Sequence, residues 1–296
     1  MSDAVMRATS VRTRRALRLA TSAAASVALV AATGCGADSA RAQDWDTVTS
    51  SRSIGDEQDL RVNVEYGAGT LNLGSAPEGS LYRADLRYDR ASFTPRMDFE
   101  DGRLRVGVTG SEVRGRSIRG SELDLLVTRT LPVDLTLQFG AAEANLDLGG
   151  IRVRNLELQT GASRTTLTVS EPNPDVCRSA TIEVGAARFQ ASGLGNLNAE
   201  QLAVRGGVGE VILDFTGEWR NDMTAGVEMG LGTLTVRVPR GLGVQVNRGG
   251  ALTSFDGQDL LRRGNSYYSE NFDDATHRLT VNLEAALGRI RVVWVD

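Results

Sequence analysis

One pattern recurs through most of this 296-residue chain: an apolar run with alternating polar residues, a corner of small residues, and a second alternating run. It is clearest in EMGLGTLTVRV (residues 228–238) and returns in QFGAAEANLDL, QTGASRTTLTV, VRGGVGEVILDF and EAALGRIRVVW. The corner glycines, separated by 21 to 24 residues, are Gly140, Gly161, Gly185, Gly207 and Gly230. A period in the low twenties with two strands per copy is typical of solenoids, in which each repeat contacts mainly its neighbours.

The apolar alternation changes phase at each corner. Val227, Met229 and Leu231 follow one another at steps of two, and Leu234 then follows after a step of three. Because strand side chains alternate with period two, both runs can face one interior only if the backbone bends or bulges between them. The sequence therefore predicts that these runs point inward on both sides of a structural corner. The residues predicted to absorb the extra step are Gly69, Ala142, Ser163, Ala187, Gly209, Gly232 and Gly288.

These repeats predict an all-β fold, a single-stranded β-helix (β-solenoid) with about seven rungs of roughly 21–24 residues. Stacked rungs would bury a continuous apolar stripe, and burial of each large side chain contributes about 1.5–3 kcal/mol. An antiparallel β-sandwich is the alternative, since short alternating strands with regular turns also permit it. The constant position of the corner favours the solenoid.

The N-terminus has the features of an export signal and is set apart from the fold. Residues 1–34 combine five arginines with an alanine-rich apolar run and end directly before Cys35. The sequence AATGC resembles the lipobox of bacterial lipoproteins, which implies that Cys35 is lipidated and becomes the mature N-terminus. Ordinary secretion, with cleavage after Ala42 and Gln43 as the first residue, is the alternative.

The predicted organisation is a lipoprotein signal peptide over residues 1–34, a tether over 35–50, an N-terminal β segment over 51–131 and repeats over 132–296. A stretch at about 240–278 interrupts the repeats and carries Phe255, Tyr267, Tyr268 and Phe272. It is predicted to be a lid over the open end of the solenoid, because exposed terminal strands invite edge pairing. The alternative is that these aromatic residues form an interaction surface.

The net charge and the missing catalytic motifs exclude several classes of function. After residue 34 the chain has 28 arginines, no lysine and 36 acidic residues, a net charge of −8, which argues against nucleic-acid binding. The motifs of P-loops, zinc proteases, redox dithiols and serine hydrolases do not occur. Cys177 has no disulfide partner besides Cys35, and the single histidine, His277, is distant from it in the sequence. Ser266 and Ser269 lie near His277, but neighbours along a loop do not by themselves indicate a triad. No cofactor or metal site is predicted.

Two stretches carry a family likeness. LRVNVEYGAGTLNLGSA, followed by LYRADLRYD, resembles the N-terminal domain of the toast-rack family of bacterial envelope proteins. VEMGLGTLTVRVPRGLGVQV and YYSENFDDATHRLTVNLEAALGRIRVVWV resemble the C-terminal domain of LiaF-type cell-wall-active antibiotic response proteins and related candidate adhesins. The likeness covers nearly all of the chain after about Trp45 and implies a β-solenoid in the bacterial envelope. LiaF-type proteins also have transmembrane helices and restrain a membrane sensor kinase, and the sequence indicates no such helices here.

The predicted function is a non-enzymatic lipoprotein of the bacterial cell envelope, exported and anchored by the lipid on Cys35 at the periplasmic or surface face. A rigid solenoid would serve as a scaffold, interaction or adhesin-like module with a link to cell-wall stress. The expected partners are the membrane, through the N-terminal lipid, and an envelope protein or glycan, but no nucleic acid. The alternatives are a surface-polysaccharide hydrolase on a β-solenoid and a modulator of an envelope-stress sensor kinase.

Overall fold

The computed structural model describes residues 44–109, 121–249 and 252–296. All 17 strands within these ranges belong to one hydrogen-bonded sheet, so the prediction of an all-β fold is confirmed. The only helical element among the described residues is a 3-10 turn, η1 (Leu194–Leu197). No helix of the described part is long and apolar enough to span a membrane.

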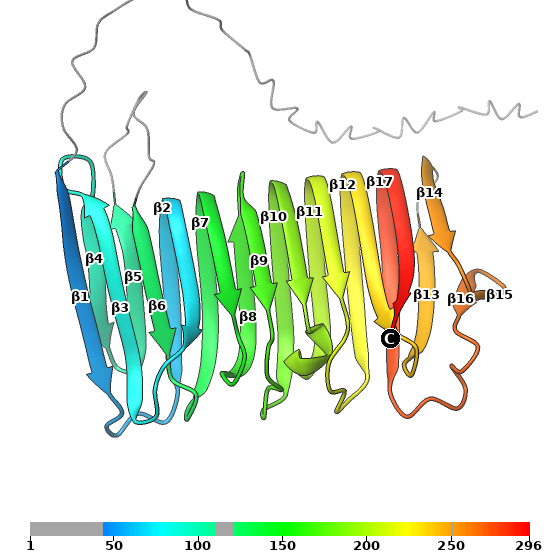
Figure 1. Ribbon diagram of the computed structural model, residues 1–296, viewed down its shortest axis with the longest axis horizontal. Coiled ribbons are helices and arrows are strands. Elements are labelled where there is room, and N and C mark those ends of the chain that lie inside the picture. The colour runs from blue at the N-terminus through cyan, green and yellow to red at the C-terminus, as the bar shows by residue number, and fades with distance from the viewer. Residues whose placement is uncertain (1–43, 110–120, 250–251) are drawn as a thin grey trace, which may run out of the picture. The chain divides into compact units, whose positions relative to one another are not determined.

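Six long strands form the frame, and each contains a predicted corner near its middle (Figure 1). They are β2 (Leu60–Ser75), β7 (Pro132–Asp147), β10 (Cys177–Ser192), β11 (Ala199–Asp214), β12 (Met223–Pro239) and β17 (Arg278–Val295). Each pairs in parallel with at least one other, as β10 does with β11 and β11 with β12. Their first halves pair only with first halves and their second halves with second halves, so the bend divides the sheet into two layers.

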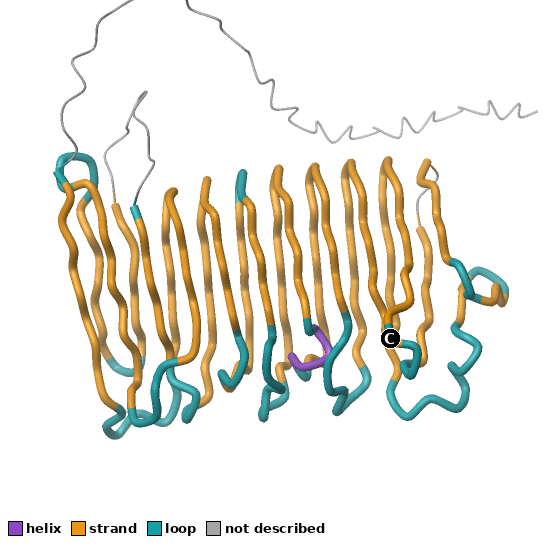
Figure 2. The backbone as a smooth tube through the Cα atoms, viewed as in Figure 1, coloured by secondary structure: helices purple, strands orange, loops and turns teal. Residues whose placement is uncertain are grey.

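The shorter strands extend one layer or the other. The layer of the first halves also contains β4 (Thr94–Glu100), β5 (Arg103–Thr109), β8 (Arg152–Thr160), β13 (Gly243–Gly249), β15 (Leu261–Arg263) and β16 (Ser266–Tyr268). The layer of the second halves contains β1 (Trp45–Ser53), β3 (Ser80–Asp89), β6 (Glu122–Val127), β9 (Arg164–Thr168) and β14 (Leu252–Gly257). We call one such crossing of both layers a level. Figure 2 shows that the long strands bend at one edge and that most connecting loops lie at the opposite edge.

Parallel pairing distinguishes this arrangement from the antiparallel sandwich that was the alternative. Antiparallel pairs are confined, in the part described, to the two ends of the sheet: β1–β3, β3–β6, β4–β5, β13–β16 and β15–β16. In the centre, β8 pairs with the first halves of β7 and β10, and β9 pairs with their second halves. The strands β7, β8, β10 and β9 thus form a small closed ring in which each strand pairs in parallel with two of the others, because β8 and β9 together make one level.

The order of levels in space differs from the order along the chain at both ends. β2 lies between β7 on one side and the β5 and β6 pair on the other, although β5 and β6 follow it in sequence. Likewise β17, the last strand, lies between β12 and the β13 and β14 pair. Parts of the segments predicted as an N-terminal region and a capping loop therefore form levels of their own, in addition to the seven predicted copies.

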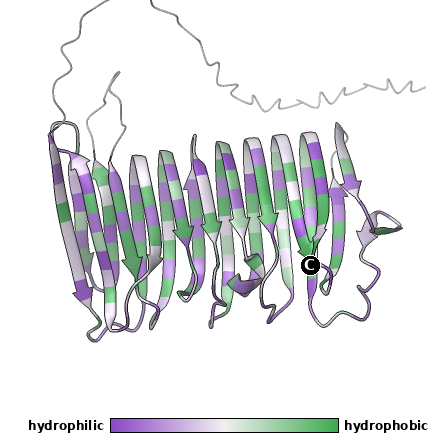
Figure 3. Cartoon of the chain, in the orientation of Figure 1, coloured by the Kyte–Doolittle hydropathy of each residue, from purple (hydrophilic) through white to green (hydrophobic). Residues whose placement is uncertain are grey.

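The core lies between the two layers and follows the predicted alternation, which gives the strands alternating polar and apolar bands in Figure 3. In β12, Val227 and Met229 are buried before the corner, and Leu234 and Val236 are buried after it. The expected inward position of Leu231 is wrong, because its side chain is 45% exposed. Its counterparts Val208 and Leu287, assigned to the same apolar run, are 54% and 51% exposed. The backbone turns before these residues, so the inward phase ends at Met229 and they lie on the outside of the bend.

Candidate interaction surface

At four of the levels the bend contains a glycine that has positive φ. Gly209, Gly232 and Gly288 have φ of 140°, 146° and 145° and are register partners on β11, β12 and β17. A Cβ added at Gly232 would lie 1.9 Å from the carbonyl oxygen of Gly209. Gly69 has the same conformation at 133° and pairs with Ala142. Neighbouring levels approach so closely that only glycine fits the three C-terminal positions.

A second column of predicted corner residues lies two positions earlier in each level. A Cβ added at Gly140, Gly161, Gly185, Gly207 or Gly230 would lie 2.5–2.9 Å from the carbonyl oxygen of the glycine one level before it. These glycines are exposed, so bare backbone forms this strip of the surface. A groove of about 1230 Å³ follows the column from β2 to β17.

Between the two glycine columns stand the exposed apolar side chains of Val208, Leu231 and Leu287, which we call the corner ridge. They are register partners on adjacent strands, Val208 with Leu231 and Leu231 with Leu287. Sequence reasoning missed them because it continued the inward alternation one residue too far. A usable signal was present: the same position is alanine in β7 (Ala141) and β10 (Ala186), so the corner does not require a large side chain.

Seven charged side chains and one threonine flank the ridge on its two sides. Three residues before the ridge position stand Glu183, Arg205, Glu228 and Glu284, and two residues after it stand Arg188, Glu210, Thr233 and Arg289. Arg205 lies 2.9 Å from Glu183 and 3.7 Å from Glu228, and Arg188 lies 3.0 Å from Glu210. These ion pairs connect successive levels along each flank. Their partly exposed charges contribute little to stability but give the surface a defined charge pattern.

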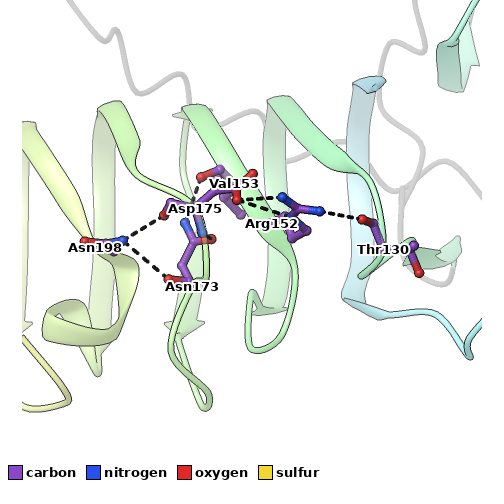
Figure 4. A network of polar contacts seen from close by, with 6 residues as sticks. All are labelled: Thr130, Arg152, Val153, Asn173, Asp175 and Asn198. Carbon is purple, nitrogen blue, oxygen red and sulfur yellow. Dashed lines mark hydrogen bonds and ion pairs between the residues drawn. The ribbon is translucent and has the colours of Figure 1, made fainter. Parts of the chain in front are cut away.

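The opposite edge is held by buried polar contacts between connections (Figure 4). Asn173 is 1% exposed, and its Nδ2 donates to the carbonyl oxygens of Val153 at 2.7 Å and Leu197 at 3.1 Å. Arg152 forms an ion pair with Asp175 at 2.8 Å in the same network. All these partners lie within the protein, so we interpret the network as structural.

The four aromatic residues of the predicted lid or surface form two ring pairs at the C-terminal end. Phe255 contacts Tyr267 with ring centroids 4.8 Å apart, and Tyr268 contacts Phe272 at 5.0 Å. All four are half-buried, and Phe255 and Tyr267 pack against the core. Arg248 lies over Phe255, at 5.7 Å from the ring centroid.

The residues considered for chemistry contact different partners. Cys177 is fully buried, and burial raises the pKa of its thiol to about 12, so it is not activated as a nucleophile. His277 lies 3.9 Å from Asp222, whereas the Ser269 hydroxyl accepts a hydrogen bond from the Val244 amide. The described residues contain no cluster of three or more potential metal ligands. Cys35 lies outside the described residues.

The architecture defines the class as an all-β protein of parallel, in-register levels. The family model described as the N-terminal domain of toast_rack, DUF2154, matches residues 39–190, which is half of the chain, and the chain therefore belongs to this family. The likeness to a LiaF-type domain in the C-terminal half remains a prediction.

Solved structures give a distant similarity. A candidate cell adhesion protein from Clostridium sporogenes ATCC 15579 is 16% identical with a TM-score of 0.45, and the match covers 85% of this chain and 100% of that one. A candidate adhesin from Bacteroides fragilis NCTC 9343 is 10% identical with a TM-score of 0.39, over 84% of this chain and 97% of that one. No curated protein matches this sequence.

Proposed function

We propose that this chain is a non-enzymatic interaction module of the bacterial envelope, exported and anchored through a lipid on Cys35. The parallel levels would form a β-solenoid that serves as a rigid scaffold, and its corner surface would contact the partner. The observation that carries this proposal is the corner ridge, an apolar row exposed on a frame whose interior is already filled. Exposed apolar residues gathered into one row mark interaction surfaces more often than residues scattered singly do.

Membership of the toast-rack family and the leader sequence support the envelope location. The resemblance of the last part of the chain to LiaF-type proteins and candidate adhesins supports the more specific proposal of an adhesin-like role linked to cell-wall stress. If that link exists, deletion of the gene changes envelope-stress transcription when cell-wall synthesis is inhibited. Unchanged transcription would leave the anchored module without a signalling role.

The anchor is tested by the two cysteines of the chain, which serve as each other's control. Cys35→Ser is expected to move the protein from the membrane fraction to the soluble fraction, because the proposed site of lipid attachment is lost. Cys177→Ser changes a buried thiol and is expected to leave the protein in the membrane fraction. Mass spectrometry of the mature N-terminus should find an acylated Cys35. A mature protein that begins at an unmodified Gln43 would overturn the lipid anchor.

A further inference from the structure

The corner ridge is not required by the fold. The levels of β7 and β10 bend with Ala141 and Ala186 at the ridge position, whereas β11, β12 and β17 carry Val208, Leu231 and Leu287 there. Val208 and Leu231 have glycines on both sides, and Leu287 stands between Ala286 and Gly288, so the three apolar groups protrude beyond their small neighbours along the bend. Because the fold does not need this exposed apolar row, we infer that the surface of a partner covers it.

The charges beside the ridge indicate which surface fits. At three of four successive levels the two flanks have opposite signs, and at the fourth a carboxylate faces a neutral side chain. The flanking pairs, in the order β10, β11, β12 and β17, are Glu183 and Arg188, Arg205 and Glu210, Glu228 and Thr233, Glu284 and Arg289. At each level, a complementary surface must therefore have a positive charge where this surface has a negative one, and a negative charge where this surface has a positive one.

A second copy of the chain does this. A two-fold axis along the ridge places each ridge residue against its own counterpart and brings each flank against the opposite flank of the other copy. Arg205 then faces the partner's Glu210, and Glu284 faces the partner's Arg289. We propose that two copies associate side by side through their corner ridges, with their levels running in the same direction.

The reversed arrangement, with the levels running in opposite directions about Leu231, is less favourable. It places Glu228 against the partner's Glu228, and like charges in direct opposition oppose association. It also sets Val208 against the partner's Leu287 instead of matching each ridge residue with itself. The same-direction arrangement has neither feature.

Association through the ends of the stack is opposed by charges that point inward there. Arg248 stands on the same side of β13 as the buried Val244 and Val246, and its guanidinium donates to the carbonyl oxygen of Thr253 at 2.6 Å. At the other end, Arg52 of β1 lies over the ring of Phe99 at 4.6 Å. Inward charges of this kind protect sheet edges from pairing with other copies.

The proposed dimer rests on the proposed function in one respect: both copies are anchored in the same membrane. A side-by-side pair keeps both copies of β1, the first described strand, at the same end, so both tethers could reach one membrane. We expect a contact made only by the ridge and its flanks to bury a smaller area than the roughly 800 Å² per partner of a typical stable complex. Anchoring two copies in one membrane raises their effective concentration and compensates for a weak contact.

Single cysteines test the geometry. Val208→Cys, Leu231→Cys and Leu287→Cys are each made in the full chain with Cys35→Ser, and the purified proteins are treated with a mild oxidant. Each is expected to form a disulfide-linked dimer at least about tenfold faster than Leu261→Cys, a similarly exposed leucine on β15, away from the ridge. If only Leu231→Cys links, or if Val208→Cys links with Leu287→Cys but not with itself, the levels run in opposite directions and the proposal is wrong.

Charge reversal tests the flanks. Glu284→Arg in the Leu287→Cys chain should slow linking several-fold, because it places an arginine against the partner's Arg289. Adding Arg289→Glu should restore the rate, since the pair is then reversed but complementary. A double variant as slow as the single one would overturn the charge pairing.

These results are separable from the anchor. If the purified variants link while the native chain proves not to be lipidated, the dimer stands and the lipid anchor fails. If the native chain is acylated at Cys35 and none of the purified ridge-cysteine variants links, the lipid anchor stands and the dimer fails.

Discussion

At the scale of the residue, two glycines of β12, one at the corner and one before it, differ in whether a side chain would fit. Gly232 combines a φ of 146° with the carbonyl oxygen of Gly209 at 1.9 Å from any added Cβ, so a side chain is excluded by conformation and by space. Gly226, on the same strand, has nothing within 4 Å of an added Cβ. Substitution of Gly226 can therefore serve as the control for substitution of Gly232.

Gly232→Ala is expected to lower the free energy of unfolding by more than about 2 kcal/mol, because the strain cannot relax without moving the backbone of the next level. Gly226→Ala is expected to raise it by about 0.5–1 kcal/mol, since alanine loses less entropy than glycine when a strand forms. Denaturant unfolding of both variants and the native chain measures the difference. Equal effects of the two substitutions would contradict a conformational role for the corner.

At the scale of the element, the connections between levels are fastened by asparagines in two different settings. The Asn173 side chain is buried and binds three backbone groups, the third being the Asp175 amide at 3.1 Å from its Oδ1. Asn145 is exposed on β7 and donates to Asn72 at 3.1 Å. A buried polar group left without its partner is costly, whereas an exposed one turns to water.

Asn173→Ala should therefore cost about 2–4 kcal/mol of stability, and Asn145→Ala less than about 1 kcal/mol. Hydrogen exchange adds a local readout: the amides of the connections around η1 should lose protection in Asn173→Ala. Unchanged protection there, together with a small loss of stability, would show that the network does not hold the connections.

At the scale of the whole molecule, two buried acids link stability to pH. Burial raises the pKa of Cys177 from 9.0 to about 12 and that of Tyr66 from 10.0 to about 12. The folded state thus keeps protons that the unfolded state releases. Their contribution to stability is complete below pH 9 and is lost as the pH rises towards 12, with a slope of up to about 1.4 kcal/mol per pH unit for each group.

The free energy of unfolding should therefore fall between pH 9 and 12. In Cys177→Ala the fall should begin about one pH unit later, because the remaining acids with a raised pKa are Tyr66 and Tyr88, whose ordinary pKa is 10.0. The lost side chain lowers stability at every pH. Identical slopes in the native chain and the variant between pH 9 and 10 would show that the thiol does not titrate on unfolding.

Much of the frame was predictable because it is local. The step of three residues at Ala68 to Leu71 and at Leu231 to Leu234 indicates a bend wherever it occurs, and small residues indicate close approach. The ridge was not predicted, since alternation alone does not tell on which side of a glycine the backbone turns. Leu231 and Met229 have the same pattern in the sequence and opposite exposures in the structure.

The sequence by itself determined the β class, the period, the bend in each level and most of the residues that fill the core, because these follow from side-chain alternation and backbone freedom. Only the tertiary structure decided which strands are neighbours. The apolar pattern of β17 would suit either the position beyond β14 or the one beside β12, and pairing placed it beside β12. Strand alternation specifies the buried face of a strand, whereas its neighbours are selected by contacts between residues far apart in the chain.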